Sequence, residues 1–492
     1  MAEEEEEYYF PEEEYIPPKY PELERFKRQL LACSSAYMGA LAAGICSTNM
    51  VHKFMNFKLD LGVDYEKTVF CTYDHDPREP LLGDAPGIVL AVPFLYFVGR
   101  RYTLLLTHLI FLTMLLVNEY FHEQQSTLQH YQRLPEELAV YFVLHGCVRF
   151  YVIVTIVYVA EVAQPSHRAP LIATFFPFFI TGVLWGRFYF RPNRLLLAAI
   201  VAQTSALILA VGAPESPYWQ AFRGKEEAAY ETFKYLRVGD DDTDELAALL
   251  ESAAPEAEQP PLAGAFGAAL AKIVFLYMGT DSVCHVFMTH LTYPLHFFRY
   301  DNTYDHEVDV TMEPARAMYL YPIIGSLVFV AVCPFVGRRI LYLSSILTTL
   351  LIFYVRHKHV TYDMNEMRVR SAEFCYFTSY LGATQVVFLL PAEIFPGKIR
   401  ELGVAICELM QFALQYADFA WLKAGFQWST YATIRLLFVP LGIILTFLFL
   451  PETKDISLIE AETEGAKFVP VILAAAKITE GLEPYEEVDE ET

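Results

Sequence analysis

Long apolar runs separated by short polar stretches dominate the sequence. Twelve of these runs approach the ~20 residues that an α-helix needs to cross the hydrocarbon core of a bilayer. Core helices of soluble proteins are usually shorter and amphipathic. The pattern therefore predicts an all-α, multi-pass integral membrane protein with twelve transmembrane helices. The runs lie at residues 30–46, 81–98, 102–121, 138–159, 171–190, 195–211, 268–289, 317–336, 340–355, 374–392, 403–422 and 432–450.

Short polar motifs recur in the loops between the runs, in the same order in each half of the chain. The second copies follow the first at offsets of 238, 232 and 237 residues. Three pairs with nearly one offset predict two copies of one six-helix unit, with all six motifs on one side of the membrane. The pairs are Gly-Arg-Arg at 99–101 and 337–339, Glu with Arg seven residues later at 161/168 and 393/400, and Pro-Glu-Ser/Thr at 214–216 and 451–453.

This repeat divides the chain into five parts. Two pseudo-symmetric six-helix bundles are predicted at 30–213 and 268–450. A cytoplasmic helical linker at 214–267 joins them, and acidic cytoplasmic tails at 1–29 and 451–492 flank them. The linker is too short and too poor in Gly loops to hold a nucleotide. We therefore expect no catalytic domain.

The net charge is −23, and the excess acid is concentrated in the two tails. Nucleic acid is excluded as a partner, because phosphate binding requires a basic patch. The composition of the tails predicts disorder. A cytoplasmic protein partner that binds these acidic and aromatic segments remains the alternative. Basic residues between Arg25 and Arg28 favour a cytoplasmic N-terminus, and an even number of crossings then places the C-terminus there too.

Motifs for enzyme chemistry are missing from the sequence. The cysteines form no CxxC pair, and no Ser/His/Asp, metal or phosphate motif stands at either membrane face. We expect neither an enzyme nor a bound cofactor or metal. The lipid bilayer and a small solute are the expected partners, with a plasma membrane favoured over an endomembrane.

Charged residues of the repeated motifs gather at one end of each predicted bundle. Charges on one face of two equivalent halves can pair across the seam between them. Such pairs exist only while that side is closed, so they can act as a gate. Local pairing that merely anchors loops is the alternative. The gate candidates are Arg100, Arg101, Glu161 and Arg168 in the first half, and Arg338, Arg339, Glu393 and Arg400 in the second.

The motifs, taken together, resemble the sugar-porter family of the major facilitator superfamily, in particular its facilitative glucose- and trehalose-type members. The matching stretches, between residues 99 and 458, are VGRRYTLL, YVAEVAQPSHR, APESPYW, VGRRILYL, LPAEIFPGKIRELGVA and LPETKDISL. The resemblance implies twelve helices, a cytoplasmic helical insert, a central solute site and alternating access. It also implies that the paired Glu and Arg residues form the inner gate.

The sequence departs from the family at the gate and at the solute site. Where the family places an acid three residues before each Gly-Arg-Arg glycine, this chain has Tyr96 and Pro334, so the gate lacks part of its charge. An unpaired buried sugar hydroxyl costs about 1–3 kcal/mol, so losing several partners disfavours a hexose. At positions that contact sugar in the family, the chain carries Phe176, Met278, Gly279, Cys284, Phe388 and Gln411.

Polar residues inside the predicted spans indicate a reshaped site where the seventh and eleventh helices meet. Asp281 and His285 share a helix face, as do Glu408, Gln411 and Gln415. The substrate-binding candidates are Gln411, Phe176, Asp281, Cys284, His285, Phe388 and Gln415. A purely structural role is equally open, in which Asp281 pairs with His285 and Arg149 pairs with Glu408 inside the bundle.

These features predict a secondary transporter of a small organic solute, a sugar, a polyol or another such molecule, that works by alternating access. Proton-coupled sugar porters carry an aspartate in the first helix, and residues 37–47 contain none. We therefore expect a uniporter that works by facilitated diffusion. A transporter-like receptor or sensor that no longer moves solute is the alternative.

Overall fold

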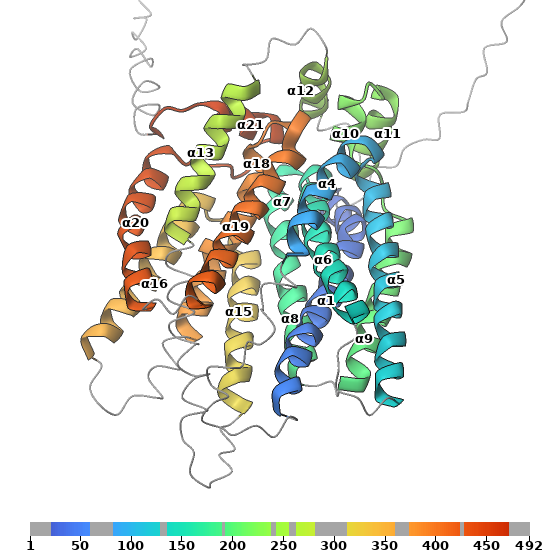
Figure 1. Cartoon of the computed structure of the whole chain (residues 1–492). Coiled ribbons are helices and arrows are strands. Elements are labelled where there is room, and N and C mark those ends of the chain that lie inside the picture. Colours follow the sequence, from blue (N-terminus) through green and yellow to red (C-terminus); the bar gives the residue numbers. More distant parts are fainter. Residues whose placement is uncertain are drawn as a thin grey trace, which may run out of the picture.

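The computed structural model describes residues 21–59, 82–127, 135–188, 192–237, 243–254, 262–280, 312–359, 373–423 and 428–471. Within these ranges the chain is helical, and no β-strand occurs. Most helices run side by side along one direction, in two groups that follow one another in the sequence (Figure 1). The architecture is that of an all-α membrane protein with two six-helix bundles.

The first bundle is built on α1, which packs against α8 and α9, while α6 packs against α4 and α5. The fifth crossing is broken at Thr174 into α7 and α8. Pro165 begins α7, where its missing N–H is not needed. The helices are α1 (Pro21–Leu59), α4 (Asp84–Val98), α5 (Arg100–Thr127), α6 (Pro135–Val162), α7 (Pro165–Ala173), α8 (Phe175–Phe188) and α9 (Pro192–Val211).

In the second bundle α13 packs against α20, and α15 and α16 both pack against the tenth crossing. This tenth crossing, Glu373–Ile394, contains a π-helical turn, η2, directly before α18. The elements are α13 (Leu262–Thr280), α15 (Met312–Val332), α16 (Arg338–His359), η2 (Ser379–Ala383), α18 (Thr384–Ile394), η3 (Gly397–Ile399), α19 (Arg400–Lys423) and α20 (Trp428–Phe449).

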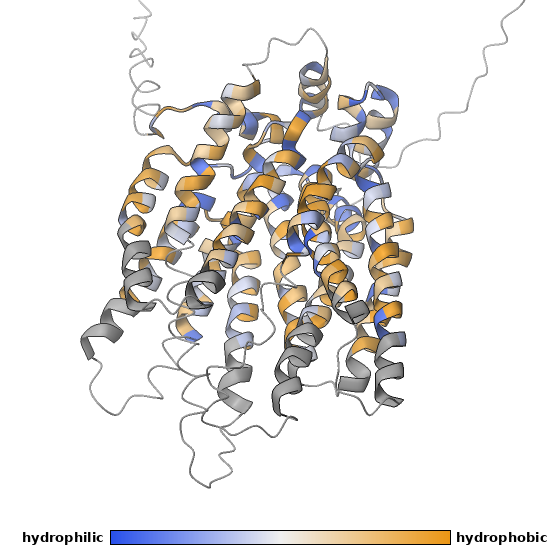
Figure 2. Cartoon of the chain, viewed as in Figure 1, coloured by the Kyte–Doolittle hydropathy of each residue, from blue (hydrophilic) through white to orange (hydrophobic). Residues whose placement is uncertain are grey.

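Each of the twelve predicted runs contains described helix. By length and composition, six of the helical spans in the described ranges are long and apolar enough to cross a membrane alone. Four shorter apolar helices in the described ranges, Asp84–Val98 among them, lie in further predicted runs. Figure 2 shows apolar residues covering the bundle and polar residues gathered toward one end. Exposed side chains such as Leu109, Ile208 and Leu347 are the lipid-facing surface that this fold requires.

Four short helices cap one end of the bundle, which we call the motif face. They are α10 (Pro217–Phe222), α11 (Glu226–Arg237), α12 (Thr243–Ala253) and α21 (Leu458–Ala466). Tyr218, Phe233, Leu249 and Leu458 form a small apolar core among them. The first three helices lie in the interval 214–267, where the sequence predicted a helical linker.

Two helices begin earlier than the predicted bundle boundaries. The first bundle begins at Pro21 rather than at residue 30, because Pro21 and the acids after it start a helix well. Gln29 is fully buried and binds Gln164, so residues 21–29 belong to the bundle rather than to a disordered tail. The second bundle begins at Leu262 rather than at residue 268. Residues 1–20 and 472–492 of the acidic tails lie outside the described residues.

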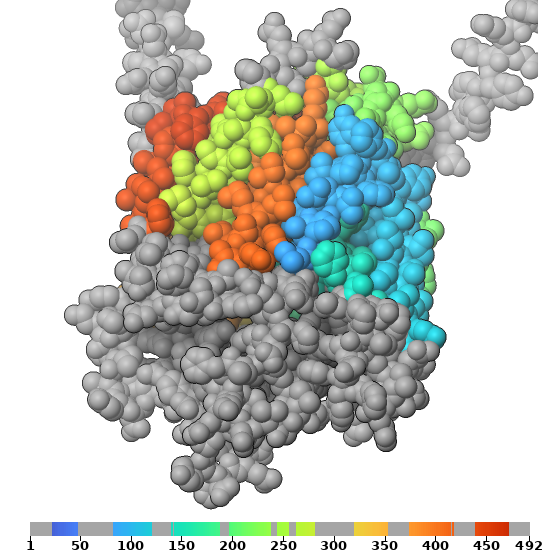
Figure 3. Space-filling model, in the orientation of Figure 1, coloured from blue at the N-terminus to red at the C-terminus, as the bar shows by residue number. Residues whose placement is uncertain are grey.

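The two bundles contact each other along a seam. On one side α19 packs against α4 and α6, and on the other α15 packs against α7 and α8. The space-filling view shows α19 in orange directly against α4 in blue (Figure 3). Residues on these helices are therefore placed to bind across the seam.

Candidate functional site

The Pro-Glu-Ser motif caps the helix that starts with Gly-Arg-Arg. Glu215 Oε1 accepts hydrogen bonds from the backbone N–H of Arg100 at 2.8 Å and of Arg101 at 3.0 Å. These are orphan donors at the start of α5. Gly99 has φ 101°, and a Cβ there would lie 2.7 Å from Glu215 Oε2, so a side chain would be strained and would displace the Glu215 carboxylate. Burial raises the pKa of Glu215.

The second copy repeats this geometry. Glu452 accepts from the backbone N–H of Arg338 at 2.9 Å and of Arg339 at 3.3 Å. The hydroxyl residue that follows each capping Glu donates a hydrogen bond to the Glu of the Glu/Arg motif in the same half. Ser216 Oγ donates to Glu161 at 2.5 Å, and Thr453 Oγ1 donates to Glu393 at 2.6 Å. The sequence did not lead us to predict this hydrogen bond, although a hydroxyl residue at the same position in both copies could have indicated it.

Two ion pairs cross the seam at the motif face. Arg400 Nη1 lies 3.1 Å from Glu161 Oε1, and Arg168 Nη1 lies 3.8 Å from Glu393 Oε1. All four side chains are at most 1% exposed. The structure thus pairs the Glu of each half with the Arg of the other half. Buried charges so paired are costly to separate.

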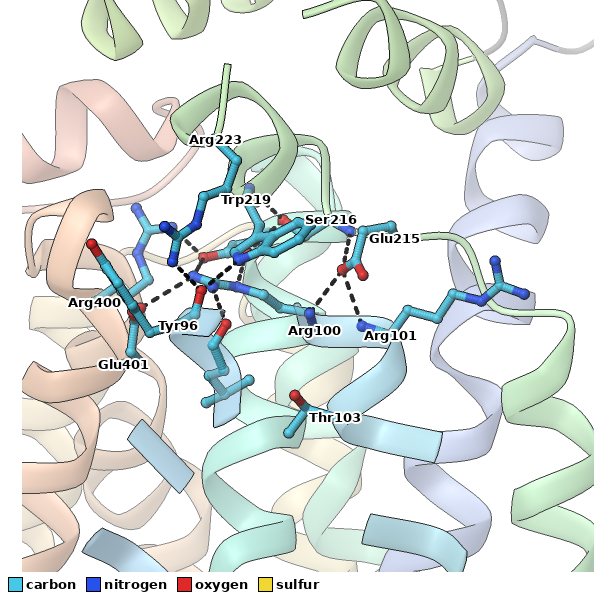
Figure 4. Close-up of polar contacts among 12 residues, drawn as sticks. Tyr96, Arg100, Arg101, Thr103, Glu215, Ser216, Trp219, Arg223, Arg400 and Glu401 are labelled. Atoms are coloured by element: carbon cyan, nitrogen blue, oxygen red, sulfur yellow. Dashed lines mark hydrogen bonds and ion pairs between the residues drawn. The ribbon is translucent and has the colours of Figure 1, made fainter. Parts of the chain in front are cut away.

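Each of these ion pairs is part of a larger charge cluster. Arg100 lies at the centre of the first cluster, which contains Glu161 and Arg400. Its guanidinium binds Glu161 through Nε at 2.9 Å and through Nη2 at 3.0 Å. Nη2 also lies 3.1 Å from Glu401 Oε2, on the opposite side of the seam (Figure 4). In the mirrored cluster Arg338 Nη2 lies 3.5 Å from Glu393. The repeated motifs did not point to Glu401.

Two of the gate candidates do not join these clusters. Arg101 extends away from Arg100 and donates to the carbonyl of Val211 at 2.9 Å (Figure 4). Arg339 donates to the carbonyl of Phe447 and lies 4.7 Å from the centre of its ring. Their contacts match the alternative expectation, local anchoring of loops and helix ends.

Helix α21 completes the first cluster from the C-terminal segment. Glu462 Oε1 lies 2.7 Å from Arg400 Nη2, and burial raises the pKa of Glu462 to about 7. Lys272 fixes the other end of α21. Its Nζ donates to the carbonyls of Glu464, Gly465 and Lys467 at 2.7, 2.9 and 2.7 Å. An ammonium is favourable at a helix C-terminus, where carbonyls lack partners.

Aromatic rings from both halves meet deeper in the bundle. Phe176 of α8 and Phe388 of α18 lie edge to face, with ring centroids 4.6 Å apart. Phe175 and Tyr380 extend the contact, at 5.3 Å from Phe388 and 5.9 Å from Phe176 respectively. Gln411 lies half-buried on α19. Two substrate candidates, Phe176 and Phe388, are thus in direct contact.

The remaining substrate candidates are not placed. Asp281, Cys284 and His285 lie outside the described residues, and Gln415 lies on α19 with a side chain that is not described. Their grouping with Gln411 stays a prediction.

A second set of charges crosses the seam between the buried parts of α4, α6 and α19. Arg149 Nε lies 3.0 Å from Asp84, and Arg149 Nη1 lies 3.2 Å from Glu408 of the other half. His145 Nδ1 lies 3.3 Å from Asp84. The structure thus brings Arg149 and Glu408 together, as the structural alternative expected. Asp84 was missed, because it stands at the edge of its apolar run.

Two pseudo-symmetric helix bundles with mirrored charge clusters at one end form the architecture of a two-half membrane carrier. The comparison with known proteins agrees. The profile of the family described as "Sugar (and other) transporter" matches residues 80–464. The chain belongs to this family, whose members are transporters and not enzymes.

Individual relatives are more distant. The inner membrane metabolite transport protein YgcS of Escherichia coli (strain K12) is 36% identical over 98 residues, which are 19% of this chain and 22% of that protein. The proton:xylose symporter XylE bound to 6-bromo-6-deoxy-D-glucose is 16% identical, with a TM-score of 0.66 over 90% of this chain and 99% of that chain. XylE from E. coli in its inward-open conformation, also 16% identical, gives a TM-score of 0.57 over 89% and 99%. These structures share the fold of this chain.

Proposed function

We propose that the protein moves a small organic solute across the membrane by alternating access. The two buried ion pairs that cross the seam, Glu161–Arg400 and Arg168–Glu393, are the main support. A carrier with two halves must close one face while the other is open, so it needs contacts that can break. Pairs between the halves meet this need, because a rocking motion of one bundle against the other separates them.

The motif face is the cytoplasmic face in this proposal. The basic residues near the start of α1 and the even number of crossings support this orientation. In this proposal the clusters form an inner gate, and the ion pairs that cross the seam belong to its closed state. A plasma membrane fits this arrangement, and the acidic tails would be available to a cytoplasmic protein partner.

The proposed substrate is sugar-like by family but smaller, less hydroxylated or cationic. Phe176 and Phe388 supply aromatic surface where a hexose would need hydrogen-bond partners. Aromatic faces attract positive charge, and Gln411 offers one amide to orient a polar group. Asp281, Cys284, His285 and Gln415 complete the proposed site.

Facilitated diffusion is the proposed mode of transport. The first helix has no carboxylate between Tyr37 and Ser47, where proton-coupled sugar porters carry one. Proteoliposomes with a pH gradient test this point, because a uniporter gives the same initial uptake with and without the gradient. Uphill accumulation driven by the gradient would show symport instead.

Uptake by the purified full-length protein in liposomes is the primary test, with a panel of sugars, polyols, organic acids and organic cations. We expect saturable uptake of at least one compound and weak or absent glucose uptake. Arg400→Gln should reduce that uptake, whereas Arg339→Gln, which removes an Arg that binds only locally among the described contacts, should retain most of it. Equal effects of the two variants would contradict the gate.

A receptor or sensor that does not transport is the second candidate. The contact between Phe176 and Phe388 favours it, because these rings occupy space between the halves. Binding of a panel compound to the purified protein without any uptake would support this candidate and refute transport.

A further inference from the structure

The carboxylate of Glu401 binds across the seam in a way that the repeated motifs do not explain. Its Oε2 lies 3.1 Å from Arg100 Nη2, and both side chains are 3% exposed. Arg100 is the side-chain partner of Glu401 within the described part of the chain. Glu401 belongs to the second half and Arg100 to the first, so this bond joins the two bundles.

The bonds of this cluster divide into two kinds. Arg100–Glu161 lies within the first bundle, and Arg400–Glu462 joins α19 to α21, which packs against α13 and α18 of the second bundle. Both survive any rigid separation of the halves. Arg100–Glu401 and Arg400–Glu161 cross the seam and break when it opens. A contact shifts a two-state equilibrium only if it differs between the states, so the crossing bonds alone favour the closed face.

The pairing of Glu401 depends on a closed seam more than the pairing of Arg100 or Arg400 does. When the seam opens, Arg100 retains Glu161 and Arg400 retains Glu462, whereas Glu401 loses its guanidinium. The repeat has no second copy of this bond. The residue that follows Arg168, as Glu401 follows Arg400, is Ala169, which is buried. The ion pairs of the mirrored cluster are longer, at 3.5 and 3.8 Å.

We propose that Glu401 is a positioning residue that holds the motif face closed, acting through Arg100. This assignment rests on the proposed alternating-access function. The Arg100–Glu401 bond makes the seam asymmetric. The ion pairs are shorter on the side where α19 meets α4 and longer on the side where α7 meets α18. Opening of the motif face then requires the loss of the Arg100–Glu401 bond.

A local role is the competing explanation. Glu401 stands in the first turn of α19, where a carboxylate favours the helix regardless of Arg100. The test must therefore separate closure of the seam from stability of this one turn. It must also work without a known substrate.

Hydrogen–deuterium exchange on the purified full-length protein meets both needs. Glu401→Gln should raise exchange at least tenfold at the motif-face ends of α4, α5, α18 and α19, as expected for the loss of one hydrogen bond between charged groups. Exchange at the opposite helix ends should fall, because opening one face closes the other. Glu401→Asp, which keeps the charge but shortens its reach, should give an intermediate change and guards against misfolding of the first variant.

Glu462→Gln is the matched control, because it makes the same substitution in the same cluster, at a carboxyl group that binds Arg400 without crossing the seam. It should not raise exchange at the seam. Raised exchange confined to the first turn of α19, or equal opening by Glu401→Gln and Glu462→Gln, overturns the proposal. Absence of solute uptake would refute the transport function without affecting this readout.

Discussion

The charge of Glu462 gives a prediction whose sign and size follow from its surroundings. Its carboxylate is largely buried against Arg400, and burial raises its pKa from 4.5 to about 7. The folded protein therefore binds this proton more tightly than the unfolded chain does. Between pH 4.5 and 7 the folded state holds more protons, so stability falls as the pH rises through this window. The contribution of this group is complete below pH 4.5 and lost above pH 7.

The magnitude is about 3 kcal/mol, because a shift of one pKa unit corresponds to about 1.4 kcal/mol. Glu462→Gln keeps the shape of the side chain and removes the titration. The midpoint of thermal unfolding, measured in detergent from pH 4.5 to 8, should fall less steeply with pH in the variant than in the unmodified protein. Comparing the two proteins cancels the titration of other carboxylates.

Glu464→Gln is the control, because Glu464 is an exposed acid on the same helix, paired with Lys467. Its pH profile should follow that of the unmodified protein. Parallel profiles for all three proteins would contradict the burial of Glu462 and the docking of α21 on Arg400.

Three further predictions concern other parts of the molecule. Lys272→Met should release the C-terminal end of α21 and raise its hydrogen exchange more than tenfold, whereas Lys467→Met, at an exposed lysine, should not. Arg149→Met should abolish folded protein in size-exclusion chromatography, because it removes the guanidinium that the buried carboxylates of Asp84 and Glu408 share, at about 3–5 kcal/mol, while Glu408→Gln should still fold. Gln411→Ala should raise the KM for the transported solute several-fold in liposomes, as expected for one lost hydrogen bond; saturable millimolar glucose uptake would falsify the divergent site.

The repeated parts of the molecule could be predicted from the sequence because each copy supports the other. Glu161 and Glu393 are weak signals alone, but their equal spacing to Arg168 and Arg400 identified the residues that the structure pairs across the seam. The boundaries of the helices were harder to predict from the sequence. Pro21 starts α1 in a stretch whose acidic composition resembles a disordered tail, and only the burial of Gln29 against Gln164 reveals the difference.

Two charged residues that the sequence did not point to, Glu401 and Asp84, have no second copy. Glu401 binds a residue 301 positions away, and Asp84 binds Arg149 at a distance of 65 positions. No periodicity or motif connects such partners, because folding alone brings them together. Charges that are repeated in both halves form equivalent contacts on the two sides of the seam, so they favour neither side as the first to open. Single-copy charges such as Glu401 remove that symmetry, so in the proposed gate the order in which the two sides of the seam open is set where the two copies differ.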